Sequence, residues 1–136
     1  MAVQQLNHFN VQTTDLEKTK SFYETVLGFT VGPRPNFDFP GYWLYCGELP
    51  VVHLTGGHRA RRDNPKDTGN FDHVAFTAAD FGGMKQHFQK LGIPFREQKV
   101  PGARVWQLFV TDPNNVVIEL NYPKSRCPHR GQSCCQ

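Results

Sequence analysis

The sequence has no apolar run approaching the roughly 20 residues that a membrane-spanning helix needs. Its first residues lack the basic and apolar regions of a signal peptide, so we expect a cytoplasmic protein without membrane partners. No long basic run is present, and the net charge of +3 is mild. The nearest basic cluster, Arg59, Arg61 and Arg62, fits a solvated loop better than a nucleic-acid site, with an anionic substrate contact as an intermediate alternative.

Cysteine is also scarce, with four residues in the chain. Cys46 stands alone in a strand-like stretch, and the other three lie within the last ten residues. Their spacing, even together with His129, matches no standard zinc pattern, and a reducing compartment disfavours a disulfide framework. We therefore expect residues 124–136 to be a disordered tail that carries Cys127, Cys134 and Cys135.

What the chain does contain is a repeat. The strand-like stretches 6–11 and 71–76 each place one histidine within a largely apolar run, His8 and His73, and the two are separated by 65 residues (73 − 8 = 65). A period of this length is too long for a solenoid and indicates a duplicated module. A length of 136 residues suits one compact domain or two half-size modules that share a core.

The first half predicts one helix and four strands. Thr14 and Glu17 form a capping-box pattern at the start of the helix, and Gly28 ends it. The helix carries apolar residues on one face at a period of 3.6. A hairpin turn joins the last two strands. The predicted strands are 6–12, 29–31, 42–46 and 51–55.

The second half repeats this order. Asp80 is placed to cap the helix, whose apolar residues recur at steps of three and four up to Gly92. Asn115 occupies a turn position that requires positive φ, which asparagine tolerates better than most residues. The predicted strands are 71–77, 93–95, 105–111 and 116–121.

Together these elements predict an α+β fold built from two βαβββ modules. The modules span residues 1–58 and 71–123, and the polar, breaker-rich residues 59–70 join them as a linker. We expect the two small sheets to pair into one curved mixed sheet around a metal-binding cup.

Four polar residues sit at matched strand positions of the two halves: His8 and His73 in the first strands, His53 and Glu119 in the last. A pseudo-two-fold axis would bring them together. A buried carboxylate needs a cation or a strong donor, and imidazoles around a divalent metal would meet that need. Such a donor set suits zinc, nickel, manganese or ferrous iron. The alternative is a metal-free, hydrogen-bonded core, with Glu119 at a sheet edge.

With these residues in place, the chain resembles the vicinal oxygen chelate superfamily, which includes glyoxalase I, extradiol dioxygenases, fosfomycin-resistance proteins and bleomycin-resistance proteins. The resemblance covers about residues 4–123. It rests on Asn7-His8-Phe9, Phe22-Tyr23, Leu27-Gly28-Phe29, Phe71-Asp72-His73-Val74-Ala75-Phe76, Asp112-Pro113-Asn114 and Ile118-Glu119-Leu120.

The resemblance implies that paired modules form a cup around a divalent metal held by His8, His73 and Glu119. His53 occupies the fourth-strand position. In glyoxalase I the residue at this position resembles a carboxylate or amide ligand, so the resemblance disfavours a lactoylglutathione lyase activity. His53 is then either a fourth ligand or an acid/base group. The resemblance also implies a homodimer, because the cup is often completed across the dimer interface.

The expected function is that of a metal-dependent, glyoxalase-like lyase or isomerase acting on a small oxygen-bearing substrate. The metal would bind one or two substrate oxygens, and Glu119 or His53 would move a proton. An extradiol-type ring-cleaving dioxygenase and a non-catalytic drug-binding protein are the alternatives. Aromatic residues near arginines would suit a small aromatic or apolar acid. The substrate contacts expected from position are Arg34, Phe37, Tyr42, Trp43, Arg104 and Gln107.

Overall fold

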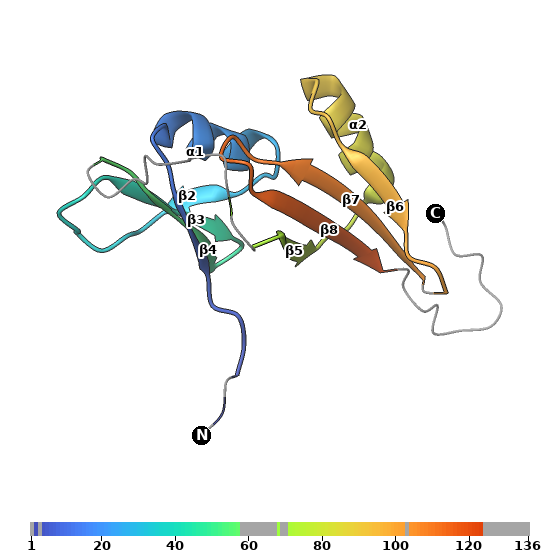
Figure 1. Ribbon diagram of the computed structural model, residues 1–136, viewed down its shortest axis with the longest axis horizontal. Coiled ribbons are helices and arrows are strands. Elements are labelled where there is room, and N and C mark those ends of the chain that lie inside the picture. Colours follow the sequence, from blue (N-terminus) through green and yellow to red (C-terminus); the bar gives the residue numbers. More distant parts are fainter. Residues whose placement is uncertain (1, 3, 58–67, 69–70, 103, 124–136) are drawn as a thin grey trace.

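The computed structural model describes residues 2, 4–57, 68, 71–102 and 104–123. The order strand, helix, strand, strand, strand occurs twice along the chain (Figure 1). This confirms the predicted α+β fold with two βαβββ modules. The first module contains β1 (Phe9–Gln12), α1 (Leu16–Thr25), β2 (Thr30–Gly32), β3 (Gly41–Cys46) and β4 (Leu49–Thr55). The second contains β5 (His73–Thr77), α2 (Phe81–Leu91), β6 (Arg96–Lys99), β7 (Val105–Thr111) and β8 (Val117–Pro123).

The strands divide into two four-stranded sheets with the same topology. The strand order is β1-β4-β3-β2 in the first sheet and β5-β8-β7-β6 in the second. In each sheet the first strand of the module pairs parallel with the last, and the other pairs are antiparallel. The duplication read from the sequence is therefore also a duplication of topology, and the expected mixed sheet is present as two separate sheets.

Each sheet buries one of its faces beneath a helix. On the central strands, Val52, Leu54 and Ile118 are at most 1% exposed and belong to the shared core. Figure 1 shows α1 and α2 on the same side of the two sheets. Because side chains alternate along a strand, His53 and Glu119 project from the opposite faces, away from α1 and α2.

The helix boundaries follow local hydrogen-bonding chemistry, with one correction. Asp15, not Thr14, caps α1, and its carboxylate accepts from the main-chain N–H of Lys18 at 3.1 Å. A carboxylate at this position also interacts favourably with the positive end of the helix dipole, and a neutral hydroxyl lacks this charge. The Asp80 cap, the left-handed Gly92 and the positive φ of Asn115 are confirmed.

The short strand predicted at 93–95 was wrong. The strand of this region is β6, Arg96–Lys99, which begins directly after the predicted segment. Ile93 and Phe95 pack against the core as a connection, which explains their apolar character. All four residues of β6 are exposed, and β6 pairs with β7 through the main chain. A polar edge strand carries little signal in its side chains, so apolar patterning could not locate it.

Hydrogen bonds join α1 to the turn between β7 and β8. The Tyr23 hydroxyl donates to Asp112 Oδ2 at 3.0 Å, and the Asn114 side-chain amide donates to the Thr19 hydroxyl at 2.8 Å. Asp112 Oδ1 accepts from the main-chain N–H groups of Asn114 and Val116. Burial raises the pKa of Asp112, and these donors oppose the rise. Two buried side-chain hydrogen bonds, from Tyr23 to Asp112 and from Asn114 to Thr19, thus join the two modules.

Several predictions fall on residues that the structure does not describe. The linker 59–70 is described only at Thr68, so the predicted module boundaries stay predictions. The basic cluster of the linker and the tail 124–136 lie outside the described residues. Cys46 is exposed. No helix in the described ranges is long and apolar enough to cross a bilayer.

We expect Tyr23→Phe to lower the free energy of unfolding by about 1–3 kcal/mol, because the buried carboxyl of Asp112 loses a donor that water cannot replace. Urea denaturation measures this change. The matched control is Tyr45→Phe, which removes an exposed hydroxyl that donates to the Pro33 carbonyl. Its cost should stay within about 0.5 kcal/mol. Equal costs for the two variants would contradict this role of Tyr23.

Candidate functional site

The first sheet carries a stack of three rings on the face away from α1. The β3–β4 register places Trp43 opposite His53, and their ring centroids lie 4.0 Å apart. His8 lies one residue before β1 and stacks on the other side of His53 at 3.8 Å. His53 is 9% exposed, whereas His8 is exposed. The structure therefore brings two of the four predicted metal ligands together.

The hydrogen bonds of these rings determine which nitrogen keeps a lone pair. Nε2 of His53 lies 3.0 Å from the carbonyl of Pro50, which only accepts, so the neutral ring has its lone pair at Nδ1. Burial lowers the pKa of His53, and the nearby charges of His8 and Arg34 lower it further. Nδ1 of His8 lies 2.7 Å from Oδ1 of Asn7, which leaves Nε2 of His8 available.

The second sheet carries a histidine–carboxylate pair at the equivalent position. Nε2 of His73 lies 2.8 Å from Oε2 of Glu119, and Nδ1 of His73 lies 2.6 Å from Oδ2 of Asp72. The side-chain amide of Gln107 donates to Oε1 of Glu119 at 2.5 Å and to Oδ1 of Asn121 at 3.0 Å. Both carboxylate oxygens of Glu119 are thereby engaged.

Glu119 is 7% exposed, so its charge needs the partners that surround it. The hydrogen bond that Nδ1 of His73 donates to Asp72 is the main cause that raises the pKa of His73, and the charge of Glu119 raises it further. Without a metal, His73 is thus a proton-holding ring between two carboxylates. A divalent cation would take the place of that proton, because metal ligands bind in their deprotonated form.

The two pairs remain separate within one chain. His8 and His53 belong to the first sheet, and His73 and Glu119 belong to the second. Among the described residues, no three His, Cys, Asp or Glu side chains lie close enough to hold one metal ion. Each pair offers two donors, fewer than the three or four protein ligands typical of zinc sites.

Of the six residues predicted to contact substrate, three lie beside these pairs, and a fourth, Phe37, packs against one of the three. Arg34 is close enough to affect His53 electrostatically, and its guanidinium packs over Phe37 at 5.0 Å. Trp43 is part of the ring stack, and Gln107 holds Glu119.

The other two predicted contacts lie elsewhere. The hydroxyl of Tyr42 donates to Glu17 of α1, which places Tyr42 on the helix side of the sheet. Arg104 is exposed just before β7. The roles of all six residues stay predictions.

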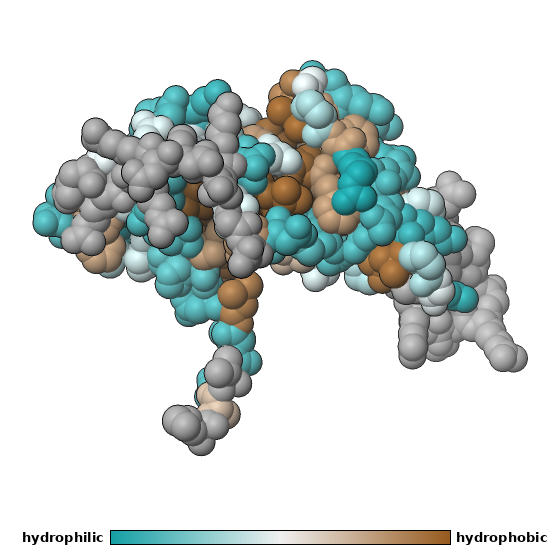
Figure 2. Space-filling model, viewed as in Figure 1, coloured by the Kyte–Doolittle hydropathy of each residue, from teal (hydrophilic) through white to brown (hydrophobic). Residues whose placement is uncertain are grey.

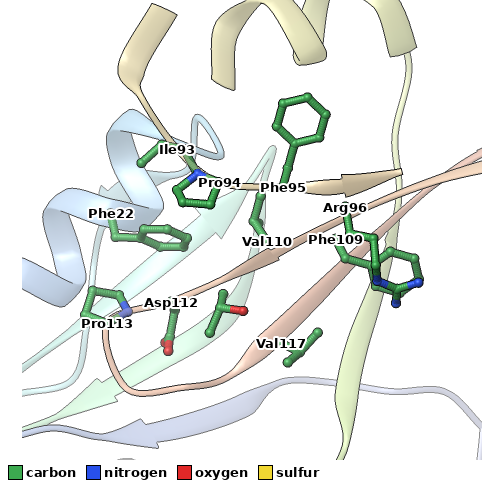
Figure 3. Close-up of a pocket in the computed structure, with 11 residues that line it drawn as sticks. Phe22, Ile93, Pro94, Phe95, Arg96, Phe109, Val110, Asp112, Pro113 and Val117 are labelled. Carbon is green, nitrogen blue, oxygen red and sulfur yellow. The ribbon is translucent and has the colours of Figure 1, made fainter. Parts of the chain in front are cut away.

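A cavity of about 540 Å³ lies beside the second pair and was not foreseen, because its residues read as ordinary core. Figure 3 shows it between α1, the connection before β6, and the strands β7 and β8. Val117 pairs with His73 in the β5–β8 register, and Phe109 pairs with Glu119. Arg96 stacks on Phe109 at 4.0 Å. The lining residues are Phe22, Ile93, Pro94, Phe95, Arg96, Phe109, Val110, Thr111, Asp112, Pro113 and Val117.

In the metal-free protein we expect His73 to titrate above, and His53 below, the ordinary histidine pKa of about 6.5. The raised pKa of His73 contributes stability that is complete below the unfolded-state pKa and is lost as the pH rises through the folded-state pKa. For His53 the contribution is present above the unfolded-state pKa and is lost as the pH falls through the folded-state pKa.

A ¹⁵N NMR titration of the histidine rings measures both values. As a control, Asp72→Ala should lower the pKa of His73 and leave that of His53 in place. A pKa of His73 at or below 6.5 in the unsubstituted protein would contradict the geometry described here.

Comparison with known proteins agrees with this architecture. The family model of the glyoxalase/bleomycin resistance protein/dioxygenase superfamily matches residues 5–120. The chain is 32% identical over 122 residues to glutathione transferase FosA of Serratia marcescens, covering 88% of this chain and 81% of that protein. It is 31% identical to glyoxylase I 4 of Arabidopsis thaliana over 124 residues, covering 85% of this chain and 68% of that protein.

Solved structures give the same result. A glyoxalase family protein from Bacillus anthracis aligns with a TM-score of 0.70 and 25% identity, covering 91% of this chain and 98% of that one. The superfamily resemblance predicted from the motifs is confirmed. The chain belongs to the glyoxalase/bleomycin resistance protein/dioxygenase superfamily, also called the vicinal oxygen chelate superfamily.

Proposed function

We propose that this protein is a divalent-metal-dependent lyase or isomerase of the glyoxalase-like kind, which acts on a small oxygen-bearing substrate. The observation that carries the proposal is the buried Glu119 carboxylate against Nε2 of His73, at the position that matches the His8–His53 stack of the other module. The superfamily membership supports it, as do relatives named lactoylglutathione lyase and metallothiol transferase.

The donor atoms suit a divalent metal. Neutral imidazole and carboxylate together fit zinc, nickel, manganese or ferrous iron. Asn7 and Asp72 occupy Nδ1 of His8 and His73, so each ring would coordinate through Nε2. In His73 the metal would replace the proton between Nε2 and Glu119, and Glu119 would supply an oxygen. These three residues would hold the metal. His53 is the fourth predicted ligand, and its stacked position next to His8 gives it a second role described below.

One chain offers the two pairs on separate sheets, so a complete site needs a second copy. In a two-fold homodimer, the first pair of one chain meets the second pair of the other. Two exposed apolar side chains support such a contact: Leu6 is 75% exposed and Phe71 is 48% exposed. Each lies two residues before a histidine of the pairs, His8 or His73, and a partner chain would cover them.

The metal, when bound, supplies a Lewis acid for one or two substrate oxygens. His53 is the residue we assign to proton transfer. Its lowered pKa keeps the ring neutral near pH 7, and its lone pair lies at Nδ1. Gln107 orients Glu119 through a hydrogen bond, and His53 accepts the proton that the substrate loses. Arg34 supplies a positive charge near His53 for an anionic substrate group.

A second candidate is metal-dependent thiol transfer. Two of the relatives are named as transferases, glutathione transferase FosA and metallothiol transferase FosB of Lysinibacillus sphaericus. The same metal ligands would then activate an electrophilic substrate for attack by a thiolate. The ring-cleaving dioxygenase and the non-catalytic binder remain outcomes of the tests below.

We expect His8→Ala and His73→Ala to bind no stoichiometric metal when each forms its own dimer, because every site then lacks one ligand. A heterodimer of the two variants should regain one metal ion, since one of its two sites contains an intact His8 from one chain and an intact His73 from the other. Differently tagged chains allow the heterodimer to be isolated, and elemental analysis counts the metal.

The unsubstituted dimer should hold two metal ions as a control. A metal-free heterodimer, with a loaded unsubstituted protein, would show that each chain builds its own site. Absence of metal from the unsubstituted protein would leave the binder alternative.

We expect His53→Asn to keep its metal and to lose about 10²- to 10⁴-fold in kcat, because general-base catalysis contributes an acceleration of that size. Glu119→Gln should instead lose metal.

The assay substrates are the hemithioacetal of a 2-oxoaldehyde with glutathione, an epoxide with glutathione, and a catechol monitored by oxygen uptake. Turnover of the epoxide would select the transferase, and oxygen uptake would select the dioxygenase. Loss of metal from His53→Asn would show that His53 is a ligand.

A further inference from the structure

His8, just before β1, and His73, the first residue of β5, share a local arrangement. Nδ1 of His8 lies 2.7 Å from Oδ1 of Asn7, and Nδ1 of His73 lies 2.6 Å from Oδ2 of Asp72. In each case the partner is the residue immediately before the histidine. Asn7 and Asp72 are also equivalent in the duplication, since they are 65 residues apart (72 − 7 = 65).

This arrangement is restricted to the proposed metal ligands. Six histidines are present in the chain, and only His8 and His73 directly follow an Asn or Asp. His53 follows Val52 and is oriented instead by the main-chain carbonyl of Pro50. The pattern therefore marks the two histidines that would coordinate through Nε2.

Stability does not account for these contacts. The side chain of Asp72 is 92% exposed, and hydrogen bonds between adjacent, exposed residues contribute little to folding. Their chemical consequence is larger. An oxygen that accepts at Nδ1 holds the proton on that nitrogen, so the neutral ring presents its lone pair at Nε2. In the second module Nε2 lies 2.8 Å from Oε2 of Glu119, so in the metal-free protein a proton occupies this position, and a divalent metal would replace that proton.

We propose that Asn7 and Asp72 are positioning residues that fix the tautomer and the ring orientation of His8 and His73 for metal coordination through Nε2. The inference rests on the proposed metal-dependent function. Asp72 and Asn7 are expected to contribute unequally to the affinity for the metal. Asp72 carries a charge, so it increases the basicity of its histidine, whereas the neutral amide of Asn7 mainly orients the ring.

The test is a Co²⁺ titration of the full-length dimer, followed by visible absorption, which reports both the affinity and the ligand set. We expect Asp72→Ala to weaken Co²⁺ binding about 10- to 100-fold, the usual effect of removing such a partner, with unchanged band positions because His73 still coordinates. Asp72→Asn should recover most of this loss, since an amide oxygen accepts in the way that Asn7 does. Asn7→Ala should weaken binding less than Asp72→Ala.

The matched control is Glu97→Ala, which also removes one carboxylate from the second module. Glu97 lies on β6 and pairs with Lys85 of α2, on the helix side of the same sheet. Its loss should leave the Co²⁺ affinity unchanged. Thermal unfolding of the metal-free variants shows that each is folded.

Three results would overturn the inference. Equal affinities for Asp72→Ala and the unsubstituted protein would remove the positioning role and leave the metal site intact. Equal weakening by Asp72→Asn and Asp72→Ala would show that charge alone matters. Failure of the unsubstituted protein to bind Co²⁺ would overturn the proposed function itself and the positioning role with it.

Discussion

A buried carboxylate at the centre of β8 is the constraint around which the second module is arranged. Glu119 is 7% exposed, and an unpartnered charge there would cost several kcal/mol. Its partners come from the two strands that flank β8: His73 from β5 and Gln107 from β7. The strand order β5-β8-β7 therefore supplies both partners of the charge.

The duplicated topology places His53 of the first module where Glu119 stands in the second. Trp43 and Phe109 are the cross-strand neighbours of these two residues, so each has an aromatic ring beside it. The first module buries a neutral ring between other rings, while the second buries a charge between hydrogen-bond donors. One backbone arrangement thus carries two different chemistries, and the hydrogen bond from Tyr23 to Asp112 is one of the contacts that join the modules.

The sequence predicted the structural features that depend on neighbouring residues or on a periodic pattern. The duplication, the cap at Asp80 and the left-handed Asn115 follow from residue chemistry within a few positions, and all three are present. The exposed edge strand β6 carries no apolar pattern, so it was misplaced. The separation of the four polar residues into two pairs depends on contacts between modules, such as Tyr23 with Asp112, which no periodicity reveals. The metal site itself stays a prediction.

The charges of the two pairs determine how copies of the chain can meet in the proposed dimer. The first pair is made of imidazoles, and the second contains a carboxylate next to a further anion, Asp72. If the second pairs of two chains faced each other, two buried carboxylates would lie in one contact. The contact between the two first pairs would then contain no carboxylate. Unlike pairs bring imidazoles to a carboxylate around one divalent cation, which balances the charges. A two-fold axis that joins unlike pairs does so twice, so the charges of the separated pairs are compatible with the proposed symmetric dimer.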